Sequence, residues 1–413
     1  MNNVKKVFVA TGNWFKSLFV SVNGKEPKLL SLLKNEKFTS AFASVICAVL
    51  GILVGFLLLL CINPEHAGEG IISILRSWAK SSRKQRRIYE LGSTLVSAAP
   101  LIMCALSVLF SYKTGLFNIG VAGQYTIGAC AALYAALAWH CPWYVCMLLA
   151  MVTGAVWAMI SGALKAFCNV NEVISCIMTN WIGLYLTNML LGNVKESTSV
   201  YTLDLGNNAP AAVIPDIGLS KLFGDNKYVT IAILFTVLIA IAVKVVLDLT
   251  TFGYELKATG YNKNAAKYAG MKDKKNIIVT MAISGALAGL GAAFYYLSGI
   301  EQYNTGYSSL PGMGFNGIAV AFLGGLNPVG SIFAGYFVQH IMIGGGKLDT
   351  QYYNPQVADF VIAIIIYLCA FVLFIKTLIA KGTRNAEKRE SERVAKLRKR
   401  AAEAADAEGK ENV

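Results

Sequence analysis

Long apolar runs, separated by short polar stretches, fill most of the chain from residue 38 to residue 380. A helix needs about 20 apolar residues to cross the hydrocarbon core of a bilayer. Counting one short element at 314–325, the pattern predicts an all-α polytopic membrane protein with about ten segments and both termini in the cytoplasm. The other segments are expected at 38–61 and 91–110, then in a third run that ends near 138, and at 143–167, 173–191, 228–247, 277–297, 330–346 and 359–379.

Two similar stretches interrupt this pattern with glycines, amides and an aromatic residue. The first runs from Gly115 to Gln124, and the second from Gly312 to Ala319. Glycine lets the backbone leave helical geometry, and amide side chains can satisfy the backbone groups that are then freed. Irregular backbone at membrane depth occurs only where protein or a water-filled cavity surrounds it. The paired stretches therefore predict broken or re-entrant half-helices, an internal repeat and a translocation pathway.

Composition and charge agree with a membrane protein and predict its topology. Only 15% of the residues are charged and the mean hydropathy is +0.54, whereas soluble domains carry about 25% charged residues. The net charge of +14 comes from basic residues that flank the spans, which favours a topological role over nucleic-acid binding. We expect a cytoplasmic arm at 1–37, an external loop at 192–228, a cytoplasmic loop at 248–276 and a charged cytoplasmic tail at 381–413, with 38–380 as the transmembrane domain.

The segment 65–90 is both apolar and strongly basic. Ile71, Ile72, Ile74, Leu75 and Trp78 fall near one helical face, while lysines and arginines supply the charge. This pattern predicts an amphipathic helix at the membrane interface. Alternation of the spans places the segment outside, against the rule that basic loops stay in the cytoplasm.

No enzyme site is predicted by the sequence. The three histidines, His66, His140 and His340, lack the spacing of metal ligands or of a catalytic triad, and no cofactor or metal is expected. The run Gly344–Lys347 resembles a phosphate loop, but Leu348 stands where such a loop needs Ser or Thr. The spans also lack the buried acidic and basic residues that are typical of proton-coupled carriers, although sodium coupling through carbonyls stays open.

The basic loop at 248–276 contains a segment suited to docking a partner. Ala265, Ala266, Tyr268 and Ala269 predict a short helix of small residues that ends at Gly270. Such a helix outside the membrane is a suitable docking surface, while a solvated connector is the plainer interpretation.

The sequence GYELKATGYNKNAAKYAGM in this loop resembles the cytoplasmic coupling segment of ABC-importer permeases for branched-chain amino acids, ribose-type sugars and nucleosides. FNIGVAGQ, VNEVISCIMTNWI and GFNGIAVAFLGGLNPVG are similar to other signatures of that family, most closely its nucleoside branch. The resemblance covers about Leu91 to Ile379 in the right order. Ala122 departs from it, because the nucleoside branch usually has an acidic residue there.

The resemblance implies a multi-pass permease subunit in a prokaryotic plasma membrane. Its partners would be a second permease subunit, expected to form a heterodimer, cytoplasmic ATPase subunits and an extracytoplasmic substrate-binding lipoprotein. ATP hydrolysis would take place in the ATPase subunits, and their movement would reach the permease through its coupling segment. The residues expected to couple to the ATPase are Tyr254, Glu255, Leu256, Lys257, Gly260, Asn262, Ala265, Ala266 and Gly270.

Amides and aromatic rings in the spans are the candidates for contact with a solute. Amides suit an uncharged, hydrogen-bonding solute such as a nucleoside, and an aromatic face can stack on a base. The competing interpretation is that the amides join helices to one another and that the rings fill the core or face lipid. The candidate pathway residues are Phe117, Asn118, Gln124, Thr179, Asn180, Trp181, Phe315 and Asn316.

Other functions remain open at this point. A permease of the same family could carry a monosaccharide or a branched-chain amino acid, although the spans offer little charge to compensate a zwitterion. A secondary carrier would depend on an ion gradient and not on ATP. A membrane scaffold without transport would leave the two broken stretches without a purpose.

Overall fold

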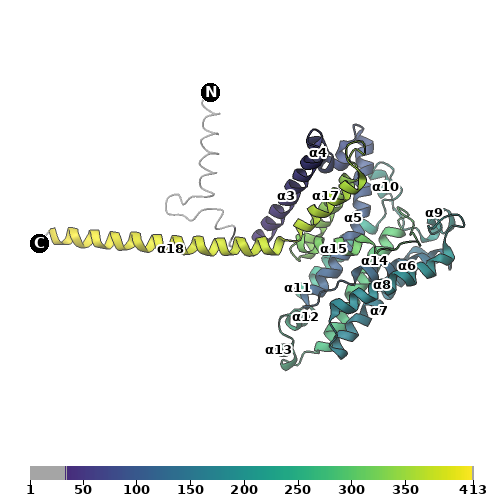
Figure 1. Ribbon diagram of the computed structural model, residues 1–413. Coiled ribbons are helices and arrows are strands. Elements are labelled where there is room, and N and C mark those ends of the chain that lie inside the picture. The colour runs from purple at the N-terminus through teal and green to yellow at the C-terminus, as the bar shows by residue number, and fades with distance from the viewer. Residues whose placement is uncertain (1–32, 34, 412–413) are drawn as a thin grey trace. The chain divides into compact units, whose positions relative to one another are not determined.

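The computed structural model describes residue 33 and residues 35–411, most of which are helical (Figure 1). The arm predicted at 1–37 lies almost wholly outside the described residues, so it stays a prediction. The chain divides into two compact units, Ala48–Ala370 and a second unit made of the two chain ends, Met1–Cys47 and Phe371–Val413. The second unit holds the first part of α3 (Glu36–Ile62) and the helix α18 (Val372–Glu411). The tail thus continues as a helix over its described residues.

The unit Ala48–Ala370 contains the rest of α3 and all the other helices. The longer helices are α4 (Ala67–Arg76), α5 (Lys84–Lys113), α6 (Val121–Leu137), α7 (Trp143–Cys168), α8 (Glu172–Leu191), α11 (Ala232–Leu249), α12 (Thr251–Tyr261), α14 (Asp273–Tyr296), α15 (Gly312–Leu323), α16 (Pro328–Gly345) and α17 (Pro355–Cys369). The shorter ones are η1 (Ser77–Lys80), η2 (Gly192–Val194), α9 (Leu205–Asn208), η3 (Pro210–Ala212), α10 (Leu219–Leu222) and α13 (Lys263–Tyr268).

Six described helices are long and apolar enough to cross a membrane, namely α3, α5, α7, α8, α11 and α14. A seventh span follows if α17 and α18 are counted as one. The helices α6 and α15 are apolar but shorter. A polytopic all-α membrane protein is therefore confirmed, while the count of ten segments and the side of each terminus stay predictions.

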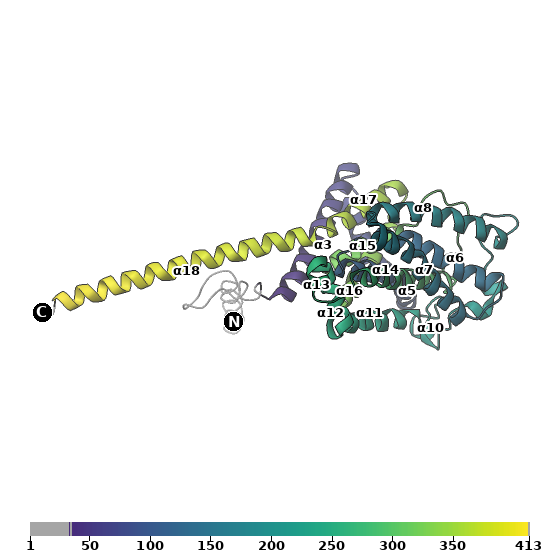
Figure 2. The same ribbon diagram turned by 90° about the horizontal axis from the view of Figure 1, so that it is seen from below.

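Helix α14 packs against α7, α5 and α6 and lies in the interior of the unit (Figure 2). Its contact with α7 is a backbone contact, because Gly285 faces Gly154 and Gly289 faces Ala150. Small residues let two helices approach this closely where the bilayer offers no hydrophobic drive to bring them together. The glycine-rich face of α14 thus sets the position of α7.

Helix α5 connects the two ends of the unit. Near its start, the Asn226 amide donates to the Ser93 hydroxyl at 2.8 Å, which fixes the loop 195–231 at that end. Just beyond its other end, Gly115 contacts Gly260 of α12. A helix of 30 residues is about 45 Å long, so the 195–231 loop and the α12–α13 pair lie at opposite ends (Figure 1).

The first glycine-rich stretch leads into α6, the second forms most of α15, and the starts of these two helices meet. Gly314 in the first turn of α15 lies against Ala122 in the first turn of α6, where an added Cβ would come 2.5 Å from the Ala122 Cα. Ala122, the position that departs from the family pattern, is itself part of this contact. The predicted interruption is confirmed only at the first stretch, where residues 114–120 are not helical. The second prediction is wrong, because Gly312–Ala319 is helical within α15, and the chain leaves helical geometry after α15, where Gly325 and Leu326 have positive φ.

The prediction of a single amphipathic helix at 65–90 is wrong. The chain forms α4 and the 3-10 turn η1, and the last residues of the segment belong to α5. The break lies at Ser77, whose φ of 35° is incompatible with continued α-helix. Helix α4 buries Gly70 and Ile74 but leaves Ile72 and Leu75 exposed, so only part of the predicted apolar face packs on protein.

Helix packing by glycine predicts that Gly289→Ala destabilises the fold. The new Cβ would overlap the backbone oxygen of Ala150, so α7 and α14 must separate, at a cost of about 1–3 kcal/mol. Gly68→Ala is the matched control, because its Cβ would meet no atom within 4 Å. Thermal unfolding in detergent should show a lower Tm for Gly289→Ala alone. Equal Tm values for the two variants would contradict the packing.

Candidate functional site

A buried network of hydrogen bonds holds the connection between α5 and α6. The Asn118 amide nitrogen donates to Gln124 Oε1 at 2.9 Å and to Ser284 Oγ at 2.8 Å. Its oxygen accepts from the Gly120 N–H at 2.9 Å and from Gln124 Nε2 at 3.1 Å. Asn118 and Gln124 are almost completely buried, and Ser284 lies in the middle of α14. The break in the helical pattern is thus tied to the central helix.

Asn180 ties α8 to the same connection. Its amide nitrogen donates to the Ile119 carbonyl at 3.1 Å, and its oxygen accepts from the Gly123 N–H at 2.8 Å. The Cys176 thiol, one turn earlier on α8, lies 3.6 Å from Asn118 Oδ1. Because buried polar groups are costly when unpaired, these bonds stabilise one specific backbone path between α5 and α6.

The other predicted pathway residues lie apart from this network. Phe117 and Thr179 are half-buried, and the Thr179 hydroxyl donates to the Cys176 carbonyl at 3.0 Å. Trp181 and Phe315 are 41% and 40% exposed, so each offers an accessible ring. Asn316 on α15 is half-buried, with its amide nitrogen 3.7 Å from the Met342 sulfur. The structure thus gathers three of the eight residues into one network, and their contact with a solute stays a prediction.

The predicted docking segment forms two short capped helices, α12 and α13. The Thr250 hydroxyl caps α12 by accepting from the Gly253 N–H at 3.0 Å, and Asn262 caps α13 through the Ala265 N–H at 3.0 Å. Gly270 follows α13 with a φ of 82°, a conformation that favours glycine. Leu256 and Ala266 are buried, whereas most of the remaining residues predicted to couple are exposed or half-buried.

The docking segment touches the connection between α5 and α6 directly. A Cβ on Gly260 would lie 2.6 Å from the Thr114 carbonyl carbon and 2.8 Å from the Gly115 nitrogen. Gly115 has a φ of 76°, so glycine is favoured there as well. The Asn276 amide nitrogen donates to Thr259 Oγ1 at 3.0 Å, which also holds α12 against α14. A displacement of α12 would therefore press on the chain just before Asn118.

The outer surface of α12 and α13 carries three exposed tyrosines. Tyr254, Tyr261 and Tyr268 are 67%, 91% and 94% exposed. A pocket of about 680 Å³ opens beside the first of them and is lined in part by Tyr254, Glu255 and Lys275. Exposed tyrosines next to a pocket are typical of protein interfaces, where aromatic anchors contribute most of the binding energy.

Several residues of these sites were not selected from the sequence. Ser284 completes the Asn118 network, but it stands among small residues of a span that predict helix packing alone. Thr280 and Thr114, whose hydroxyls lie 3.2 Å apart, also connect α14 to the connection after α5. Tyr261 and Tyr268 could have been found from the sequence, because large aromatic residues are unusual in a short solvated connector.

Among the described residues, no three His, Cys, Asp or Glu side chains gather as metal ligands. At the end of α7, the ion pair between Lys165 and Glu172, 2.8 Å apart, satisfies two charges near the start of α8. The structure joins a buried amide network to the exposed helices α12 and α13.

A family model described as the permease component of branched-chain amino acid transport systems matches residues 91–370. The chain belongs to this family. The guanosine ABC transporter permease protein NupP of Bacillus subtilis is 37% identical to this permease over 299 residues, which cover 71% of the permease and 84% of NupP. The nucleoside ABC transporter permease protein NupB of Lactococcus lactis is 30% identical over 365 residues, 84% of the permease and 95% of NupB.

The glucose ABC transporter permease protein TsgB13 of Haloferax volcanii is 31% identical over 278 residues, 65% of the permease and 72% of TsgB13. No solved structure matches the permease. Membership of the family makes the permease a multi-pass transport subunit of the plasma membrane and not an enzyme. ABC permeases work with ATPase and substrate-binding partners.

The buried network predicts that Asn118→Leu destabilises the permease. Leucine leaves the Gly120 N–H and the Gln124 amide without their partner, at about 1–3 kcal/mol for each buried group. The control is Asn207→Leu, because Asn207 is exposed on α9. A thermal unfolding scan should show a lower Tm only for Asn118→Leu, and an unchanged Tm would mean that the network contributes little.

Proposed function

We propose that this permease forms the translocation pathway for nucleosides in an ATP-driven importer. The observation that carries the proposal is its similarity to permeases for guanosine and nucleosides over most of their length. The prevalence of amides and aromatic rings, with few charges in the spans, agrees with an uncharged solute that offers both hydrogen bonds and a flat face.

The contact between Gly115 and Gly260 supports a route from ATP hydrolysis to the pathway. The ATPase subunits dock on α12 and α13 and move them as they close. Gly260 passes this movement to Gly115, and the Asn118 network passes it on to α14 and α8. A coupling of this kind works when the two states of the ATPase contact the docking segment differently.

The predicted pathway residues divide into two roles in this proposal. Phe117, Trp181 and Phe315 contact the solute, with Thr179 and Asn316 beside them, since these side chains are half-buried or exposed. Asn118, Gln124 and Asn180 hold the broken helix in shape, since their hydrogen bonds are satisfied within the permease. The solute therefore meets a surface whose position the amides set.

The assembly around this permease follows from the family. A second permease subunit lies beside it, and we expect the two to differ in sequence, as the family resemblance implies. The α12–α13 pair and both termini face the cytoplasm, and the loop 195–231 faces the extracytoplasmic binding protein. The basic loop between α11 and α14 supports this orientation.

A monosaccharide is the second candidate solute, favoured by the similarity to the glucose permease TsgB13. A branched-chain amino acid fits less well, because the spans hold little charge to compensate a zwitterion. An ion-coupled carrier differs from all three ATP-driven importers, because its uptake depends on an ion gradient.

The proposed solute predicts the outcome of an uptake screen on the assembled complex in vesicles. Nucleosides, guanosine among them, should be taken up with ATP and should compete with one another. Uptake should stop when ATP is withdrawn and continue when the ion gradient is removed. Uptake of glucose or leucine without nucleoside uptake would overturn the assignment of the solute, and uptake without ATP would overturn the importer.

The coupling route predicts that Gly260→Ala uncouples ATP hydrolysis from uptake. The new Cβ displaces α12 from the Thr114–Gly115 backbone and leaves the exposed side chains of α12 and α13 unchanged. We expect uptake to fall at least tenfold while the complex still assembles and hydrolyses ATP. Gly192→Ala is the matched control, because its Cβ would meet no atom within 4 Å. Normal uptake by Gly260→Ala would contradict the route.

A further inference from the structure

The end of the permease opposite α12 and α13 carries a concentrated positive charge. The segment from α4 to the start of α5 contributes six exposed cations and Lys347 adds a seventh, and Glu90 pairs with Arg86 and Lys347. The six exposed cations are Arg76, Lys80, Arg83, Lys84, Arg86 and Arg87. We refer to these six residues as the basic rim. In the proposed orientation it lies outside the cell, where basic loops are disfavoured.

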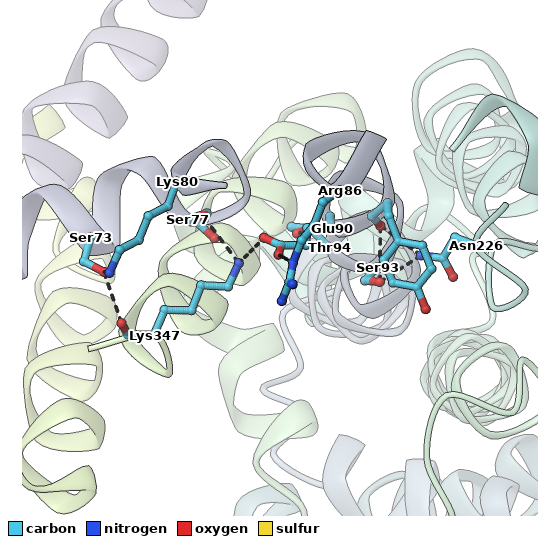
Figure 3. Close-up of polar contacts among 10 residues, drawn as sticks. Ser73, Ser77, Lys80, Arg86, Glu90, Ser93, Thr94, Asn226 and Lys347 are labelled. Carbon is cyan, nitrogen blue, oxygen red and sulfur yellow. Dashed lines mark hydrogen bonds and ion pairs between the residues drawn. The ribbon is translucent and has the colours of Figure 1, made fainter. Parts of the chain in front are cut away.

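A polar cluster fixes the rim to the rest of the permease (Figure 3). Lys347 pairs with Glu90 and donates to the Ser77 carbonyl at 3.3 Å, while Arg86 contacts the same carboxylate at 3.1 Å. Lys80 donates to the Ser73 hydroxyl at 2.9 Å. The single carboxylate is thus shared between two cations.

The remaining rim residues are available to a ligand. Among the described residues, no carboxylate lies within 4.0 Å of the charged nitrogens of Arg76, Arg83, Lys84 or Arg87. The Arg87 guanidinium donates to the Ser82 carbonyl at 3.4 Å. Four exposed cations on one short segment repel one another, so an anion bound among them would stabilise it.

The rim continues from an exposed aliphatic face. Ile72 and Leu75 on α4 are 49% and 43% exposed, and Arg76 stands one turn after Ile72 on the same face. The opposite face of α4 is packed, with Gly70 against Leu59 of α3. The helix therefore packs on one face and presents aliphatic side chains and cations on the other, the pattern of a helix at a membrane interface.

We propose that the basic rim binds an anionic phospholipid, whose phosphate lies among Arg76, Arg83 and Lys84 while an acyl chain covers Ile72 and Leu75. The external side assumed for the rim rests on the proposed function. An acidic protein surface would match the cations but would leave the two aliphatic side chains uncovered. A phospholipid matches both features, and its charge offsets the cost of a basic segment at this end.

The test measures lipid retained by the complete complex. Complexes are purified from bilayers of phosphatidylglycerol and phosphatidylcholine, and the lipid that remains bound is quantified by mass spectrometry. The variant is Arg76→Gln/Arg83→Gln/Lys84→Gln. The matched control is Lys195→Gln/Lys221→Gln/Lys227→Gln, which removes three exposed lysines from the loop at the same end. A second variant, Ile72→Ser/Leu75→Ser, removes the aliphatic contact and keeps every charge.

We expect the rim variant to retain at least threefold less phosphatidylglycerol, the aliphatic variant to lose it as well, and the control to retain it fully. Equal retention by rim variant and control would overturn the proposal. The rim variant alone could lose phosphatidylglycerol, and inorganic phosphate could displace the lipid. That result would show a site for anions in general and would also overturn the proposal. Loss of the binding protein with unchanged lipid would identify an acidic protein as the occupant. Retention needs no transport, so failure of the nucleoside assignment leaves this result unaffected.

Discussion

The close backbone contact between Gly260 of α12 and residues Thr114 and Gly115 is the interaction on which the rest of the structure depends. A side chain at either glycine would separate the docking helices from the connection between α5 and α6, so the contact requires the two glycines together. On one side of it lies a surface with three exposed tyrosines, and on the other a buried amide network. The contact joins α12 to the connection between α5 and α6, although the two are far apart in the sequence.

The network beyond this contact explains how a broken helix is held in shape in a membrane protein. Asn118 and Asn180 provide partners for backbone groups that lie outside regular helix, and Ser284 anchors them to α14. Because Gly285 and Gly289 bring α7 against the same helix, the break has rigid surroundings on several sides. A local movement at Gly115 is then passed to whole helices, since closely packed helices move as units and do not deform gradually.

The sequence predicted several spans, the glycine-rich break before α6 and the short helices at 251–268, because hydrophobic length, glycine content and capping residues are local signals. It placed the second break within Gly312–Ala319, which is helical, because glycine content alone does not show whether a helix is interrupted. It did not predict which groups the amides would contact, since Ser284 and Asn118 are joined only by the fold. The prediction of one helix over 65–90 failed because the chain breaks at Ser77. There, contacts with α16 and Lys347 stabilise a turn although the local apolar periodicity favours a continuous helix. The two half-helices were expected, but their meeting at Gly314 and Ala122 is a tertiary contact that no local pattern shows.

Hydrogen–deuterium exchange on the assembled complex tests most directly whether the docking helices and the broken helix move together. Exchange is compared between the nucleotide-free complex and the complex trapped with ATP and vanadate. The account predicts that peptides covering 251–270 and 114–124 change exchange together on trapping, while peptides of the 195–231 loop near η3 do not follow the same time course. A change in 251–270 with unaltered exchange in 114–124 would contradict it.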